Sequence, residues 1–116
     1  MRMPNAERAE VDIQKLVGYC LSPTHDLGKH KARVFAAALD WTVENAEEVR
    51  TLLQQAATTY DATVGERDAY GQRYVVDFPV QGPCGDVWVR SAWIIRTDED
   101  FPRLTSCYVI EEEVRS

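Results

Sequence analysis

The residues whose types and spacing could do chemistry are concentrated in segment 19–35, which reads YCLSPTHDLGKHKARVF. Both histidines of the chain and three of its 13 Lys and Arg residues fall here, although the protein is acidic overall. A helix that begins near Gly28 would present unpaired backbone N–H groups beside cationic side chains, and such helix starts bind phosphate or carboxylate. We therefore predict an anion site formed by Gly28, Lys29, His30 and Arg33.

A wider set of side chains could carry out acid–base and phosphoryl chemistry. Metal-independent cleavage of RNA needs a base for the ribose 2′-OH, an acid for the leaving 5′-oxygen, and cations that stabilise the transition state. His25 could be the base or the acid, because histidine titrates near neutral pH without perturbation. Lys31 projects from the apolar face of the predicted helix and could bind the phosphate, assisted by Arg90 or Arg33. A hydroxyl from Thr105 or Tyr108 could donate to a nonbridging oxygen.

Each of these side chains also has a structural interpretation. His25 could hydrogen-bond to the backbone of its own turn. Lys31 could run its aliphatic stem past the first helix, or pair with Asp26 or Asp77. Arg90 could neutralise Asp77 across a sheet or stack on an aromatic ring.

Cysteine and histidine spacing does not indicate a metal site. Cys20, His25 and His30 are spaced C-x4-H-x4-H, without the closely paired ligands of most structural zinc sites. The three cysteines, which include Cys84 and Cys107, are odd in number and widely separated, so we predict reduced thiols. Motifs for nucleotide cradles, serine hydrolases and zincins are also missing. We predict no metal and no cofactor.

The length of 116 residues predicts a single α+β domain spanning residues 1–116. No apolar run of roughly 18 residues is present, and the first residues do not resemble a signal peptide, which predicts a cytoplasmic protein that does not bind membranes. The net charge of −6 argues against nonspecific binding to long nucleic acid. Acidic runs at 44–48, 98–100 and 111–113 could meet a basic protein. The sequence does not decide the oligomeric state.

The apolar periodicity predicts three helices in the first half of the chain. The first, capped by Asp12, should run for about ten residues. The second should span Leu27–Leu39, with Leu27 on its apolar face, and the third Asn45–Thr58, with Thr42 as a plausible cap. Before them, the first eight residues look loosely attached, as does the acidic tail.

The second half alternates in the manner of β-strands, with turn residues between the runs. We predict strands at Ala62–Glu66, Gly71–Val80, Asp86–Arg96 and Arg103–Ile110. Segment 87–95 is apolar on both faces, which indicates a central strand. The predicted fold is α+β, with three N-terminal helices packed on a three- to four-stranded antiparallel sheet. Its core should contain Phe35, Leu39, Leu53, Tyr74, Val76, Phe78 and Trp93.

The motifs YCLSPTH, GKHKARVF and FPRLTSCY, in this order, resemble an uncharacterised family of short bacterial proteins that is classed as a domain of unknown function. More distantly, helices followed by an antiparallel sheet whose last strand reads R-L-T-x-x-Y are similar to the barnase/EndoU/RelE-like superfold of small ribonucleases and toxins. That resemblance implies catalytic roles on one sheet face for His25, Lys31, Arg90, Thr105 and Tyr108.

Two classes of function follow. The first is a small metal-independent ribonuclease-like or RNA-binding protein of toxin type, whose ligand is RNA or another phosphate-bearing molecule. The second is a noncatalytic module, such as an antitoxin, an immunity protein or an accessory protein, whose acidic surface meets a basic protein. The clustered His, Lys and Arg residues favour the first class, and the acidic composition favours the second.

Overall fold

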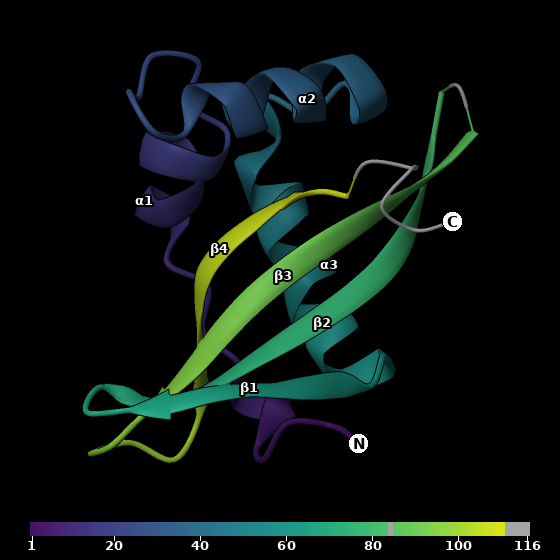
Figure 1. Cartoon of the computed structure of the whole chain (residues 1–116). Helices are drawn as coiled ribbons and strands as arrows, with labels where there is room; N and C mark the ends of the chain where they lie inside the picture. Colours follow the sequence, from purple (N-terminus) through teal and green to yellow (C-terminus); the bar gives the residue numbers. More distant parts are fainter. Residues whose placement is uncertain (84, 111–116) are drawn as a thin grey trace.

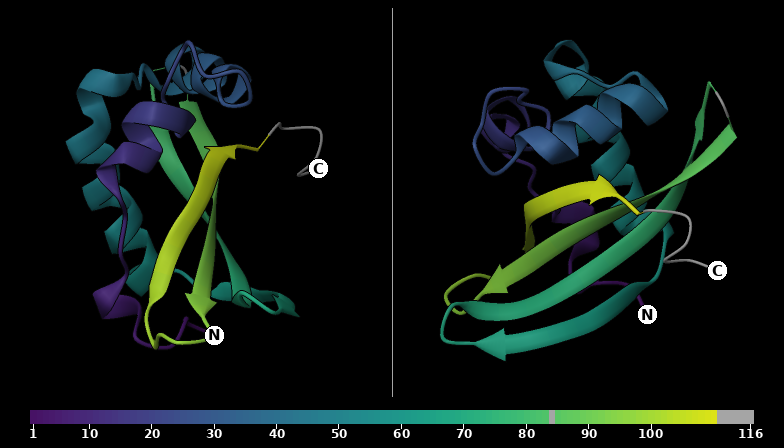
Figure 2. Two further views of the ribbon diagram at one scale, coloured as in Figure 1. Left: turned by 90° about the vertical axis from the view of Figure 1, so that its left-hand side faces the viewer. Right: turned by 45° about the horizontal axis from the view of Figure 1, so that its top comes forward.

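Helices fill the first half of the chain and strands the second half in the computed structural model of the protein, which describes residues 1–83 and 85–110 (Figure 1). Three helices come first and a four-stranded antiparallel sheet follows, as predicted. Among the described residues, the helices lie on one side of the sheet and leave its other side without helical cover (Figure 2). No described helix is long and apolar enough to cross a membrane.

The first predicted helix forms, but it is irregular. The Asp12 side chain accepts a hydrogen bond from the Gln14 amide and begins α1 (Ile13–Lys15). The chain then continues as a π-helical turn over Leu16–Cys20, whose ends are both buried. Because a π-turn is wider than an α-turn, it shifts which side chains face inward from this point. Val17, at 38% exposed, does not join the core.

The second helix, α2 (Lys29–Leu39), begins two residues later than predicted. The prediction that Leu27 lies on the apolar face is wrong, because this side chain is 75% exposed. The cause is the turn before the helix: the His25 ring accepts hydrogen bonds from the amides of Leu27 and Gly28, and holds both residues outside the helix. Gly28 also packs so closely on the Tyr19 backbone that a Cβ atom would clash with it.

The third helix begins one residue later than predicted, and Thr42 caps the 3₁₀ turn that leads into it. Thr42 and Asn45 form a capping box around a short 3₁₀ turn (Val43–Asn45), and α3 follows over Ala46–Thr59. The expectation that the first eight residues are loose is wrong. They include a 3₁₀ turn over Ala6–Arg8, and Met3 is buried at 3% exposed. The acidic tail 111–113 lies outside the described residues.

The sheet is a meander in which each strand pairs with the next one along the chain. Its order is β1-β2-β3-β4, and all pairs are antiparallel. The predicted central strand is confirmed, because β3 lies between β2 and β4. The strands are β1 (Ala62–Asp68), β2 (Gly71–Gly82), β3 (Gly85–Arg96) and β4 (Pro102–Val109).

The core lies between the helices and the sheet, and every residue predicted for it is buried: Phe35, Leu39, Leu53, Tyr74, Val76, Phe78 and Trp93. One polar side chain, Ser91, is completely buried among them. Its hydroxyl donates to the Val76 carbonyl at 2.8 Å and accepts from the Trp93 indole at 2.9 Å. The buried hydroxyl and the buried indole therefore satisfy each other.

A β-bulge in β4 decides which side chains of that strand face the helices. Ala92 pairs with Ser106 and Trp93 pairs with Leu104, so Thr105 is the extra residue. Before the bulge Leu104 faces the core, and after it Cys107 does, whereas strict alternation would place 104 and 107 on opposite faces. Ser106 and Tyr108 consequently share the other face with Ala92 and Arg90.

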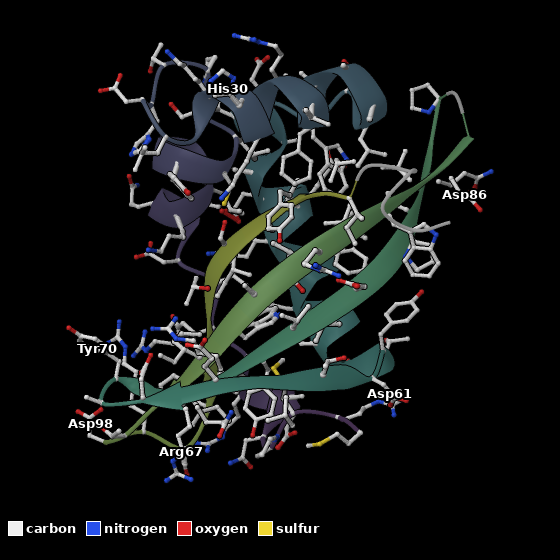
Figure 3. All side chains as sticks on the ribbon, viewed as in Figure 1. His30, Asp61, Arg67, Tyr70, Asp86 and Asp98 are labelled. Carbon is white, nitrogen blue, oxygen red and sulfur yellow. The ribbon has the colours of Figure 1, made fainter. Side chains whose placement is uncertain are left out.

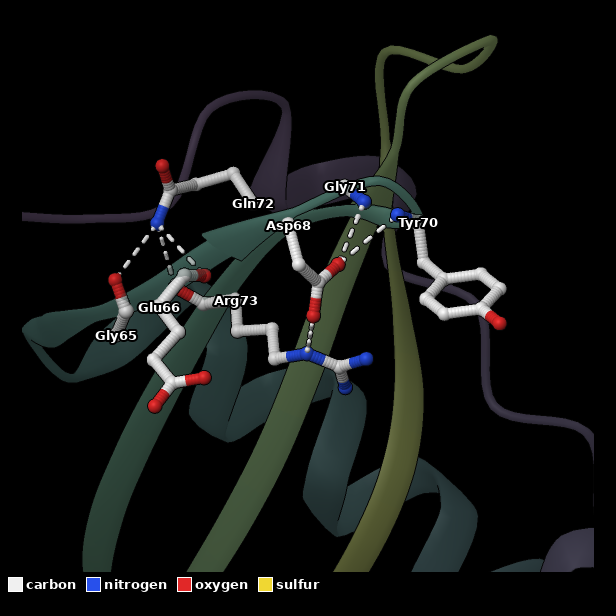
Figure 4. Close-up of polar contacts among 7 residues, drawn as sticks. All are labelled: Gly65, Glu66, Asp68, Tyr70, Gly71, Gln72 and Arg73. Atoms are coloured by element: carbon white, nitrogen blue, oxygen red, sulfur yellow. Dashed lines mark hydrogen bonds and ion pairs between the residues drawn. The ribbon is translucent and has the colours of Figure 1, made fainter.

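The turn between β1 and β2 is held by one carboxylate (Figure 4). Asp68 accepts hydrogen bonds from the amides of Tyr70 and Gly71 and pairs with Arg73 at 3.1 Å. Gly71 has a φ of 151°, a backbone conformation that residues other than glycine rarely adopt. Tyr70 projects from the tip and is 73% exposed (Figure 3).

Candidate functional site

The ammonium group of Lys31 is held by side chains from two other elements, the π-helical turn and β4. Its Nζ atom donates to the Tyr19 hydroxyl at 2.9 Å and to the Ser106 hydroxyl at 3.1 Å. The same atom lies 4.9 Å from the centre of the Tyr19 ring and 5.2 Å from the centre of the Tyr108 ring. We call Tyr19, Lys31, Ser106 and Tyr108 the Lys31 site.

The groups that contact this cation directly are neutral hydroxyls and aromatic rings. The ion pairs of residues 1–83 and 85–110 do not include Lys31, and the carboxylate of Asp77, one of its predicted partners, pairs with Arg90 instead. Hydroxyl groups and ring faces solvate an ammonium without cancelling its charge. Because Lys31 is only half-buried, that charge remains accessible to an anion.

Arg90 joins the Lys31 site through Tyr108. The two residues are direct partners between β3 and β4. Arg90 forms a two-pronged ion pair with Asp77, with both N···O distances at 2.9 Å, so the predicted neutralisation of Asp77 across the sheet is confirmed. These bonds to Asp77, together with a hydrogen bond to Tyr108, raise the pKa of Arg90 above its ordinary value. Arg90 is thus fixed in place beside Tyr108.

The His25 ring packs against Tyr19, and one of its two nitrogens already accepts hydrogen bonds from the backbone. Its Nδ1 atom accepts hydrogen bonds from the amides of Leu27 and Gly28, each at 3.0 Å, so the proton of the neutral ring is on Nε2. The ring meets the Tyr19 ring edge-on, with 4.9 Å between the ring centres. The structural interpretation of His25 as a turn residue is therefore confirmed, and only Nε2 is available to a ligand.

Thr105 does not reach the Lys31 site. Its hydroxyl donates to the Ala92 carbonyl at 3.1 Å, where it satisfies an acceptor beside the bulge. Ser106, the next residue, takes the place that the sequence assigned to Thr105. The β-bulge is the reason, because one inserted residue exchanges the faces of a strand.

The four residues predicted to form an anion site at the helix start lie in different environments. The Gly28 amide donates to His25, so this donor is already used. His30 is exposed on the outer side of α2 (Figure 3). Lys29 and Arg33 line a separate groove on α2. The structure thus brings His25 and Lys31 to one place, but it gathers the four predicted anion ligands around no single point.

Two buried thiols lie next to the Lys31 site. Cys20 and Cys107 are free thiols with no exposed surface. A hydrogen bond from Cys107, aided by the nearby Lys31 charge and by Ser106, lowers the pKa of Cys20 to about 7 in spite of its burial. The same hydrogen bond, together with burial, raises the pKa of Cys107. Cys84 lies outside the described residues.

Sequence reasoning missed two members of the Lys31 site, Tyr19 and Ser106. A signal for Tyr19 was present, since it lies in the same YCLSPTH motif as His25. For Ser106 the sequence held no such signal, because a bulge is invisible in the alternation of a short strand. Conversely, Thr105 and Tyr108 are three residues apart, and strict alternation would never place them on one face.

Comparisons with known proteins give a family and a fold. The family model of DUF6883, a domain of unknown function, matches residues 2–111. Among solved structures, one similar chain belongs to a contact-dependent growth inhibition toxin–immunity protein complex from Klebsiella pneumoniae 342. It is 16% identical, with a TM-score of 0.61, and the match covers 91% of this chain and 97% of that chain. No curated protein matches. The resemblance to the barnase/EndoU/RelE-like superfold is not confirmed by these matches.

Proposed function

The chain belongs to the DUF6883 family, a domain of unknown function, and we propose that it is a small RNA-binding and RNA-cleaving protein of toxin type. The observation that carries this proposal is the position of Lys31. An accessible ammonium group that contacts hydroxyls and aromatic rings, and forms no ion pair with a carboxylate of the described residues, is suited to a phosphodiester.

The neighbouring groups have roles that fit RNA cleavage without a metal. Lys31 would bind a nonbridging phosphate oxygen, and the Ser106 hydroxyl beside it would donate to the same phosphate. Tyr19, whose hydroxyl accepts from Lys31, would use its own proton on the leaving oxygen. His25 would donate through Nε2 to the phosphate or the ribose, and solvent water would take the proton that the ribose 2′-OH loses as its oxygen attacks phosphorus. Arg90 would act indirectly, because it holds Tyr108 in place.

The test is cleavage of single-stranded and structured RNA by the purified full chain in the presence of EDTA. We expect Lys31→Met to lower the cleavage rate about 10²-fold or more, because the apolar stem is kept and only the charge is lost. Lys15→Met is the matched control, since Lys15 is exposed on α1. His25→Ala should lower the rate to a similar degree. Circular dichroism would verify that each variant is folded.

A different result would overturn this function. If the wild-type chain cleaves none of these RNAs, or if Lys31→Met and Lys15→Met cleave equally well, the Lys31 site is not a catalytic phosphate site.

A second candidate is a noncatalytic module of antitoxin or immunity type that binds a basic protein. The observation in its favour is the first turn of α3 and the 3₁₀ turn before it, where Glu44, Glu47 and Glu48 are all exposed. The similar fold occurs in a complex that contains both a toxin and an immunity protein, so it supports either candidate. For this module, neutralising Glu47 and Glu48 should weaken a salt-sensitive complex, whereas Lys31→Met should leave it intact.

A further inference from the structure

A groove on α2 lies apart from the Lys31 site. It has a volume of about 380 Å³, and most of its lining is apolar. Leu21 and Ala32 are buried beneath it, and the half-buried Trp41 forms one wall, backed by the stacked ring of Phe35 at 5.4 Å. A groove of this size accepts one flat ring, and the stacked aromatic pair gives that wall a rigid surface.

Two cations stand beside this apolar groove, and their charges are not compensated within the described residues. Lys29 and Arg33 both line it, but neither takes part in the ion pairs of residues 1–83 and 85–110. Like charges four residues apart on a helix repel each other. By contrast, six arginines elsewhere on this acidic protein have carboxylate partners: Arg2, Arg8, Arg50, Arg73, Arg90 and Arg103.

We propose that this groove is a nucleoside subsite for single-stranded RNA, which places a base against Trp41 and the attached phosphate between Lys29 and Arg33. The proposal rests on the RNA function proposed above and adds a second point at which the substrate is held. Apolar walls with one aromatic face suit a nucleobase, and two unpaired cations suit its phosphate.

The groove and the Lys31 site are close enough to serve one strand. Lys31 lies between Lys29 and Arg33 in the sequence, but its side chain leaves α2 toward β4. Because a helix with its side chains is roughly 10–12 Å across, a strand of a few nucleotides that crosses α2 would reach both places. All three basic side chains in the first turns of α2 would then contact one ligand.

The direct test is an NMR titration of the full chain with 5′-AMP, with inorganic phosphate as a separate probe. We expect 5′-AMP at millimolar concentration to shift the Trp41 indole signal and the amides of Lys29 and Arg33. Two variants should abolish these shifts: Arg33→Gln removes a phosphate contact, and Ala36→Leu fills the groove from an exposed helix position. Lys15→Gln, which changes a cation on α1, should leave them unchanged.

A second measurement uses a single-stranded RNA of about eight nucleotides and the same variants. Ala36→Leu should weaken binding about tenfold, the effect expected from losing one stacked base. Since 5′-AMP binding requires no cleavage, the groove can fail this test while the Lys31 site passes its own, and the reverse also holds. Thermal melting of Ala36→Leu would show that the variant remains folded.

Three outcomes would overturn the subsite. If inorganic phosphate alone produces the same shifts with the same affinity, the groove holds an anion but no base. Should a peptide rich in Asp and Glu shift these signals when 5′-AMP does not, the groove is a docking site for an acidic protein. If 5′-AMP leaves the Trp41 signal in place at millimolar concentration, the groove is not a nucleoside site.

Discussion

Lys31 shows how the neighbours of a charged residue, rather than its place on a helix, decide what that residue can do. The sequence predicted that this lysine projects from an apolar face, and the structure shows two tyrosine rings and a serine hydroxyl around it. The predicted pairing of Arg90 with Asp77 needed only strand register and was confirmed. The membership of Ser106 depended on a bulge and was not predictable.

The exchange of Thr105 for Ser106 gives a prediction at the same scale. Ser106→Ala should weaken RNA binding or cleavage severalfold, because the hydroxyl beside Lys31 is lost. Thr105→Ala should leave that activity unchanged and should lower the free energy of unfolding by about 1 kcal/mol, because its bond to the Ala92 carbonyl is structural. Activity assays and urea denaturation of both variants would check this. Equal activity losses would contradict the assignment.

The buried thiol of Cys20 predicts a pH dependence. Its pKa is lowered to about 7 in the folded protein, chiefly by the hydrogen bond from Cys107, from the ordinary value of 9.0. Between these pH values the unfolded chain binds more protons, so the free energy of unfolding should rise as the pH increases from 7 to 9. Cys20→Ser should remove this rise, which urea denaturation at several pH values would measure. A wild-type profile that falls over this range would argue against a Cys20 thiolate.

At the scale of elements, the ends of helices were harder to predict than their existence. Thr42, the predicted cap, caps the 3₁₀ turn that leads into α3, and a Thr followed by Asn45 is a local signal for this capping box. The start of α2 depended on His25 accepting two backbone hydrogen bonds. A histidine in a sequence does not by itself indicate such bonds. Strand ends differed from their predicted positions by at most two residues, since glycines and polar turns bound them.

The β1–β2 turn gives a prediction for acid conditions. The Tyr70 amide and the Arg73 side chain lower the pKa of Asp68 below its ordinary value of 3.8. The contribution of this carboxylate to stability is therefore present above pH 3.8 and is lost as the pH falls through the lowered pKa. Asp68→Asn should reduce the melting temperature at neutral pH and flatten its decline in acid. Asp86→Asn, at an exposed position of β3, is the control and should change neither.

At the scale of the whole molecule, one buried hydrogen-bond pair connects two central strands. Ser91→Ala leaves the Trp93 indole and the Val76 carbonyl without their partner in a fully buried place. We expect the free energy of unfolding to fall by about 1–3 kcal/mol, which urea denaturation followed by tryptophan fluorescence would measure. Ser106→Ala, at a half-buried hydroxyl, offers a comparison. A loss no larger than that of Ser106→Ala would contradict this role.

The layered arrangement was predictable because it follows from periodicity alone. Apolar spacing identified seven core residues correctly, among them Phe35 and Trp93, without any information on contacts. The attachment of the N-terminal segment was not predictable, since Met3 and Ala6 are buried by long-range packing. Long-range packing also explains why the candidate site was predicted only in part. Its residues come from three elements that meet only in the folded chain.

The bulge in β4 also affects how relatives of this protein should be aligned. A relative with one residue fewer between Leu104 and Tyr108 would have no bulge, and the residue in the Thr105 column would then pair opposite Ala92, where Ser106 pairs now. Its hydroxyl, and not that of the Ser106 column, would approach the lysine. Residues of the Lys31 site should therefore be matched between family members by strand register, because matching by alignment column could assign the hydroxyl to the wrong position.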